Sequence, residues 1–170
     1  LSPAGIAQAE AIATRVADLA PDLILTSPLR RAAETADIIA ATCGTQAVPN
    51  DLLLEINFGK LEGMTLEEAS GMYPGITDSW QALAGDFSFP GGENFLHFNH
   101  RAHQMAEMVR ERPENDILLV AHGGILRGVL CHLLAVEADG PLRFRLGYAA
   151  LTTVIVYDDA GAVLTGFNMG

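Results

Sequence analysis

The sequence predicts an α/β fold with a largely parallel sheet and an antiparallel end. Two short apolar runs, residues 23–25 and 117–120, are typical of strands buried on both faces. Amphipathic stretches with helical spacing alternate with such runs through most of the chain. Two final apolar segments, residues 151–157 and 162–167, flank an Asp-Asp-Ala-Gly turn, which predicts a closing hairpin. The 170 residues suit a single domain spanning residues 1–170.

The first half of the chain shows two helix starts of the same kind. Ser2 can cap a helix whose first position is Pro3, and apolar residues then recur at helical spacing to residue 19. Ser27 and Pro28 repeat this start, and we expect a second helix that ends near residue 43, before Gly44. Residues 47–48 are a weak strand candidate.

The second half contains a long irregular region. Thr65 and Glu68 form a capping-box pattern that opens a short helix. Residues 71–92 are rich in Gly, Pro, Asp and Ser, with a short helix expected near Trp80. We therefore expect residues 59–92 to form a lid or wall within the domain. A long helix is predicted for residues 93–112, and another follows the strand at 117–120.

The composition bounds the partners of the chain. Hydrophobic residues make up 49% and charged residues 18%, and the net charge is −11. This charge argues against nucleic acid or an anionic membrane surface as a partner, but a few local cations suffice for a small anionic substrate. No apolar run is long enough to span a membrane. The two cysteines, Cys43 and Cys131, lie far apart, which favours reduced thiols and a cytoplasmic location.

The most informative stretch runs from residue 120 to residue 127. His122 and Gly123 come directly after a buried strand and directly before an apolar helix. Open α/β sheets bind ligands at such a place, where free N–H groups and the helix dipole attract anions. We expect His122 and Gly123 to bind phosphate. The alternative is a histidine that only caps the turn.

Two arginines open the second predicted helix, where cations oppose the helix dipole. Arg30 has Glu34 four residues on, the spacing of a surface ion pair, whereas Arg31 has only Thr35 there. Arg31 therefore suits a ligand, and Arg30 suits a structural role. The alternative is that both arginines are merely solvated.

One carboxylate stands out among apolar neighbours. Glu55 lies within Leu-Leu-Leu-Glu-Ile-Asn-Phe, where desolvation would favour its protonated form and suit it to act as a general acid. The alternative is an exposed residue in a simple alternation. Glu62 and Glu93 are weaker candidates, and Glu93 has the alternative role of beginning a helix.

We expect no metal site and no cofactor. His97, His100 and His103 are spaced by three residues, so they fan out around a helix instead of converging, and they lie off its apolar stripe. No Cys/His cluster, Walker loop or dinucleotide-binding glycine pattern is present in the sequence.

Five segments, in order, resemble motifs of the histidine phosphatase superfamily, also called the phosphoglycerate mutase-like family. They are L-S-P-A-G-I-A-Q-A from residue 1, S-P-L-R-R-A with T-A from residue 27, L-L-E-I-N-F-G with E-G from residue 53, P-G-G-E from residue 90, and A-H-G-G-I-L-R from residue 121. Each motif is weak alone, but the ordered set covers most of the chain.

The resemblance implies a three-layer, phosphoglycerate mutase-like fold with helices on both faces of the sheet. It also implies roles: Arg31 as the second phosphate-binding arginine, Glu55 as the proton donor to the leaving oxygen, and His122 as the second histidine of the phosphate pocket. The implied function is a metal-independent phosphomonoesterase that acts on a small phosphorylated metabolite through a phosphohistidine.

The chain departs from the family pattern in one respect. The family's first motif, R-H-G at the end of a first strand, supplies the nucleophilic histidine and should precede Leu1. We expect that strand and that histidine upstream of this sequence. Two alternatives remain: a phosphoglycerate mutase, and a non-catalytic phosphate-binding module that lacks R-H-G. The closing strand is a candidate for pairing in a homodimer.

Overall fold

The centre of the fold is a parallel sheet of three strands. The structure, a computed structural model, describes residues 1–81, 87–136, 145–158 and 161–170. Strand β1 (Leu23–Thr26) lies between β2 (Ala47–Pro49) and β3 (Ile117–Val120), and both pairings are parallel. A parallel arrangement needs a crossover between strands, which the intervening helices supply.

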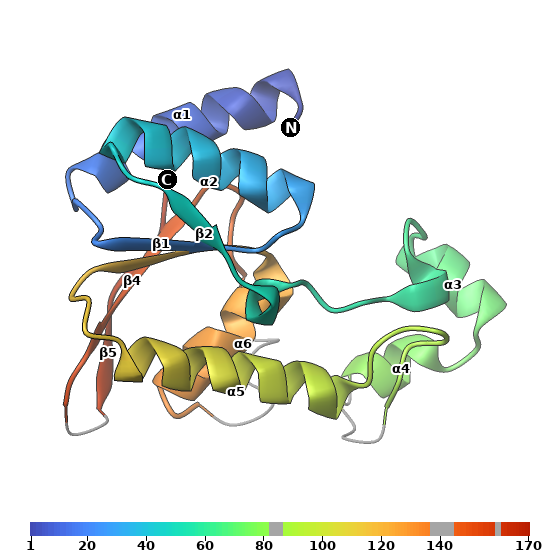
Figure 1. Ribbon diagram of the computed structural model, residues 1–170. Helices are drawn as coiled ribbons and strands as arrows, with labels where there is room; N and C mark the ends of the chain where they lie inside the picture. Colours follow the sequence, from blue (N-terminus) through green and yellow to red (C-terminus); the bar gives the residue numbers. More distant parts are fainter. Residues whose placement is uncertain (82–86, 137–144, 159–160) are drawn as a thin grey trace.

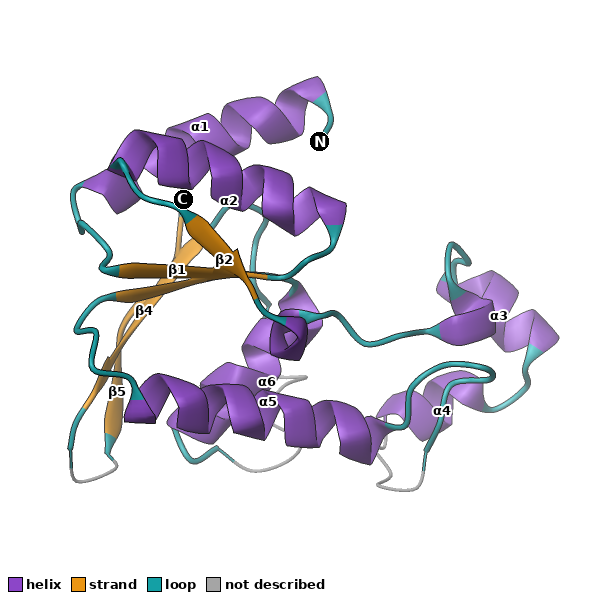
Figure 2. Ribbon diagram, viewed as in Figure 1, coloured by secondary structure: helices purple, strands orange, loops and turns teal. Residues whose placement is uncertain are grey.

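Helices cover both faces of this sheet, as the resemblance predicts (Figure 2). Helices α1 (Pro3–Ala17) and α2 (Arg30–Cys43) lie on one face, and α5 (Phe95–Glu111) and α6 (Gly123–Leu133) lie on the other (Figure 1). Because side chains alternate along a strand, Ile24 packs into the cluster under α1 and α2, whereas Leu25 packs into the cluster under α5 and α6. The three-layer α/β prediction is confirmed.

The chain ends in the predicted antiparallel hairpin. Strands β4 (Leu151–Val156) and β5 (Ala162–Met169) pair with each other as a separate two-stranded sheet. Part of the predicted turn, residues 159–160, lies outside the described residues. Arg15 on α1 donates a hydrogen bond to the carbonyl of Gly170, so the end of β5 lies beside the first helix.

Several helix ends follow the local signals in the sequence. The Ser2 hydroxyl accepts a hydrogen bond from the Gly5 N–H with Pro3 in the first turn, and Gly44 ends α2 with a φ of 69°. Thr65 and Glu68 form the predicted capping box. Local chemistry therefore decides these ends.

The region from 59 to 92 contains short helices. A 3₁₀ turn (Gly59–Leu61) precedes α3 (Leu66–Met72) and α4 (Ile76–Gln81), and residues 82–86 lie outside the described residues. The rings of Phe58, Trp80 and Phe89 pack edge to face, with centroids 4.9–5.9 Å apart. Helices α3 and α4 extend beyond the amino end of α5, on the side where the parallel strands end (Figure 1). That this region acts as a lid or wall stays a prediction.

Among the described residues, no helix is both long enough and apolar enough to cross a membrane.

Candidate active site

The three principal candidates follow the carboxyl ends of the three parallel strands. Arg31 comes after β1, His122 lies two residues beyond the end of β3, and Glu55 follows β2 by way of a 3₁₀ turn (Asp51–Leu53). Carboxyl ends of parallel strands meet at one edge of a sheet, where ligands bind in folds of this class. Hydrogen bonds bring all three residues together at the amino end of α6.

His122 lies at the centre of this group. It is the residue that precedes α6, and it is only 8% exposed. Its Nδ1 accepts a hydrogen bond from Arg31 Nε at 3.1 Å, and its Nε2 lies 2.8 Å from the hydroxyl oxygen of Ser27. Its side chain makes no capping hydrogen bond to α6, so the ring does not cap the turn.

The surroundings of His122 keep its imidazole neutral. Burial and the positive charge of Arg31 lower the pKa of His122 from 6.5 to about 4. Arginine can only donate, so Nδ1 accepts, and the proton of the neutral ring sits on Nε2 and is donated to Ser27.

Ser27 is a site residue that the sequence did not reveal. We expected it to cap the second helix, and this is wrong: α2 begins at Arg30, after Leu29. The Ser27 N–H instead bonds to the Val120 carbonyl at 3.0 Å, which extends the β1–β3 ladder by one residue and holds the serine at the sheet. Its side chain is fully buried against His122. The motif S-P-L-R-R-A is the signal that could have indicated it.

Glu55 occupies a different environment from the expected one. Its carboxylate accepts hydrogen bonds from the N–H groups of Gly124 at 2.9 Å, Ile125 at 3.2 Å and Ile56 at 3.0 Å. An apolar sequence neighbourhood thus places the side chain not in an apolar pocket but on the first turn of α6, where a negative charge is favoured. Glu55 and His122 therefore share one helix end.

The positive groups of the site converge from two helices. Arg31 lies in the first turn of α2, whose amino end meets that of α6 at this edge of the sheet. Arg30 forms the predicted surface ion pair with Glu34, at 2.6 Å. A Cβ atom built on Gly123 would have no described atom within 4 Å, so there is open space beside the first residue of α6. Such a cluster of donors suits a phosphate group.

The weaker candidates lie elsewhere. Glu62 accepts from the Phe58 N–H, and Glu93 pairs with Arg101. Glu93 does not begin α5, because Asn94 caps that helix. His97, His100 and His103 lie on α5, and the described residues contain no group of three or more His, Cys, Asp or Glu side chains that could hold a metal ion.

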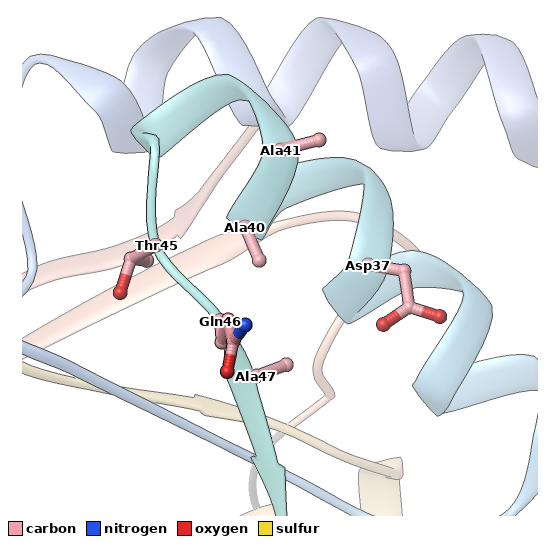
Figure 3. A pocket seen from close by; sticks show the side chains of 6 residues that line it. All are labelled: Asp37, Ala40, Ala41, Thr45, Gln46 and Ala47. Carbon is pink, nitrogen blue, oxygen red and sulfur yellow. The ribbon is translucent and has the colours of Figure 1, made fainter.

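A separate hollow of about 350 Å³ lies between the end of α2 and the start of β2 (Figure 3). Small side chains line most of it, and its charged group is the carboxylate of Asp37. An anionic lining does not suit a phosphate, so this hollow is not part of the site.

Comparison with known proteins identifies the family of the chain. The profile of the histidine phosphatase superfamily (branch 1) matches residues 1–169. The chain belongs to the histidine phosphatase superfamily. Phosphoserine phosphatase 1 from Hydrogenobacter thermophilus is 32% identical over 96% of this chain and 78% of its own length. A protein named probable phosphoglycerate mutase GpmB, from Erwinia tasmaniensis, is 31% identical over 91% of this chain and 72% of its length.

Solved structures of this superfamily have the same fold. A mycobacterial glucosyl-3-phosphoglycerate phosphatase, in complex with inorganic phosphate, superposes with a TM-score of 0.85 at 27% identity. The match covers 99% of this chain and 86% of that protein. Membership of the histidine phosphatase superfamily, together with relatives named as phosphatases, supports phosphatase activity.

Proposed function

We propose that the protein is a metal-independent phosphomonoesterase that acts on a small phosphorylated metabolite through a phosphohistidine intermediate. The observation that carries this proposal is the meeting of Arg31, His122 and Glu55 at the amino end of α6. Arg31 would supply the cation, His122 the imidazole and Glu55 the carboxyl group that phosphoryl transfer uses, all at the same helix end.

Binding of the phosphoryl group would use the hydrogen-bond donors of this cluster. Arg31 lies 3.1 Å from His122, so one phosphoryl group can contact both side chains and the first turn of α6. The amino ends of α2 and α6 add partial positive charge. These groups would offset the negative charge on the equatorial oxygens in the transition state.

The chemical step is a double displacement. A neutral histidine nitrogen bonds to phosphorus as the bond from phosphorus to the leaving oxygen breaks. Glu55 takes part in this step in its protonated form and gives its proton to that oxygen. Water then attacks the phosphohistidine, Glu55 takes back a proton, and phosphate is released. His132 lies at the far end of α6, about 15 Å along the helix, and the other three histidines lie on α5. In the family pattern the attacking histidine belongs to the R-H-G motif, which is not among the residues of this sequence.

The named relatives support the substrate class. They include phosphatases for phosphoserine and for glucosyl-3-phosphoglycerate. Both names describe small metabolites in which the phosphate is an alkyl ester. An alkoxide is a poor leaving group, so such a substrate depends on the proton that Glu55 supplies.

A second candidate is a phosphoglycerate mutase, which returns the phosphoryl group to another hydroxyl. The similarity to the GpmB protein favours it. The short region between Gly59 and Gly92 favours the phosphatase, since mutases of this family that use bisphosphoglycerate tend to carry a larger insertion there.

The test is phosphate release by the native protein, with its own N-terminus, from an aryl phosphate in the presence of a chelator. We expect steady turnover, its loss in His122→Ala, and a protein-bound phosphoryl group that is labile in acid and stable in alkali. Transfer to added 3-phosphoglycerate without net phosphate release would favour the mutase. A folded protein with neither activity, and with no R-H-G in its upstream sequence, would make it a phosphate-binding module.

A further inference from the structure

The segment that carries Glu55 is held by an arginine from another element. Residues 54–58 belong to no helix or strand, so no regular hydrogen-bond ladder fixes them. Arg101, on α5, donates from Nη1 to the carbonyl of Leu52 at 3.1 Å and to the carbonyl of Leu54 at 2.8 Å. The second of these carbonyls belongs to the residue directly before Glu55.

Glu93 holds the other side of the same segment. Its carboxylate accepts from Arg101 Nε at 3.1 Å and from Arg101 Nη2 at 2.9 Å, a two-point pairing. It also accepts from the N–H of Asn57 at 3.3 Å, and the Glu93 N–H donates to the Asn57 carbonyl at 2.8 Å. The ion pair therefore contacts the backbone both before and after Glu55.

The ion pair of Arg101 and Glu93 is suited to hold the backbone around Glu55 in one position. The side chains of Arg101 and Glu93 are only 19% and 17% exposed, and the guanidinium also lies 5.3 Å from the centre of the Phe98 ring. The planar guanidinium directs its donors at fixed angles, which the flexible ammonium of a lysine cannot do. Helix α5 has 17 residues and packs against α6, the helix that receives the Glu55 carboxylate.

We propose that Arg101, together with Glu93, is a positioning residue that places the Glu55 carboxyl group for proton transfer to the leaving oxygen. This inference rests on the proposed function, because it assumes that Glu55 is the proton donor. Its consequence is specific: loss of Arg101 slows the reaction most where the leaving group needs a proton.

The experiment measures kcat/KM of the native protein for two substrates, p-nitrophenyl phosphate and an alkyl phosphate. An aryl oxide with a nitro group leaves without a proton, whereas an alkoxide does not. We expect Arg101→Gln to lower the alkyl phosphate value about tenfold or more beyond its effect on the aryl phosphate. Arg101→Lys keeps the charge, so its kcat/KM for the alkyl phosphate should lie between that of the native protein and that of Arg101→Gln.

Arg110→Gln is the matched control. Arg110 lies on the same helix, donates to the carbonyl of Leu133 at 2.9 Å and pairs with Glu107, and its side chain is 17% exposed. Arg110 makes similar contacts to a backbone carbonyl and a glutamate, but away from Glu55. Arg110→Gln should therefore lower kcat/KM for both substrates equally or not at all.

Combining Arg101→Gln with Glu55→Gln distinguishes a failure of the positioning role from a failure of the proton-donor role. In Glu55→Gln, adding Arg101→Gln should cause no further loss that depends on the leaving group. If Arg101→Gln and Arg101→Lys slow both substrates equally while Glu55→Gln is selective for the alkyl phosphate, the positioning role is wrong and the function stands. If Glu55→Gln itself is not selective, the proton-donor role fails. Should Arg101→Gln not fold, Arg101→Lys and Glu93→Gln carry the same comparison.

Discussion

The absence of a side chain at Gly124 leaves space for the carboxylate of Glu55. A Cβ atom built on Gly124 would lie 2.3 Å from Oε1 of Glu55 and 2.9 Å from its Cδ. The carboxylate reaches the first turn of α6 because no side chain stands in its way. The second glycine of the A-H-G-G motif is thus explained by Glu55, a residue 69 positions earlier.

We predict that Gly124→Ala displaces the Glu55 carboxylate. Hydrolysis of an alkyl phosphate should then slow by about tenfold or more, and hydrolysis of p-nitrophenyl phosphate much less. Steady-state kinetics on both substrates measures this. In a Glu55→Ala background the same substitution should cost nothing further, and an additional selective loss there would show that Gly124 acts by another route.

His122 should make the stability of the protein depend on pH. Its pKa is about 4 in the folded chain and about 6.5 when unfolded, so the unfolded chain binds more protons between these values. Keeping His122 neutral therefore adds up to about 3 kcal/mol to the free energy of unfolding above about pH 6.5. This stabilisation is lost as the pH falls from about 6.5 to about 4.

Urea unfolding at about pH 7 and about pH 4 measures the loss of stability. His122→Asn should lose less stability than the native protein over this interval, since it lacks the titrating ring. Equal losses in both proteins would mean that His122 is not held neutral by the fold.

Single-residue chemistry was predictable where it depends on close neighbours in sequence. The four-residue spacing to Glu34 separated Arg30 from Arg31, and the structure shows that ion pair. Ser27 was misassigned because its partners, Val120 at the end of β3 and His122 before α6, are distant in sequence, with His122 95 residues away. Arg101 gave one signal: it adjoins the apolar stripe of α5. No local pattern indicates which carbonyls it meets.

Residues 57–59, just after Glu55, contact the P-G-G-E loop (residues 90–93) through backbone atoms. A Cβ atom on Gly59 would lie 2.4 Å from the nitrogen of Gly92, and the Lys60 N–H bonds to the Pro90 carbonyl at 2.9 Å. Two glycines are needed because any side chain would separate the loops. This contact keeps Glu93 beside the Glu55 segment.

Gly59→Ala should therefore destabilise the protein by about 2–4 kcal/mol, as measured by urea unfolding. Gly63 is the matched control, since it also has a positive φ, 78° against 57°, but open space around its Cβ position. Gly63→Ala should cost about 1 kcal/mol, the price of the backbone conformation alone. Equal costs would show that the loop contact contributes nothing.

Most element boundaries were predictable because they depend on local chemistry. Ser2, Gly44 and the Thr65 capping box act within a few residues, and each does so in the structure. The start of α2 was predicted two residues early, at Pro28 instead of Arg30, because the β1–β3 ladder continues through Ser27. The contact between the loops at Gly59 and Gly92 joins segments about 30 residues apart, and no spacing rule announces such a pairing.

The hairpin has an exposed apolar face, and we predict that this face pairs with a second copy of the chain. Ile155 and Val163 are paired across β4 and β5 and are 48% and 49% exposed, with Tyr157 and Phe167 also exposed. Strand β5 carries no charged residue, although the chain has a net charge of −11. An uncharged strand that lacks the usual protective charges is suited to antiparallel pairing with its own copy.

We predict a homodimer through this face, to be measured by light scattering during size-exclusion chromatography. Val163→Glu should give a monomer that keeps its phosphatase activity, because Val163 lies on the hairpin and not at the amino end of α6. A native protein that stays monomeric at high concentration would contradict the prediction.

A crystal structure of the native protein with inorganic phosphate would show whether the amino end of α6 is the phosphoryl-transfer site. We expect the phosphorus atom between Arg31 and His122, with both side chains and the first turn of α6 within hydrogen-bonding distance of the phosphate oxygens. Phosphate bound elsewhere, with the contact between Arg31 and His122 unchanged, would contradict the assignment of the phosphoryl-transfer site to the amino end of α6.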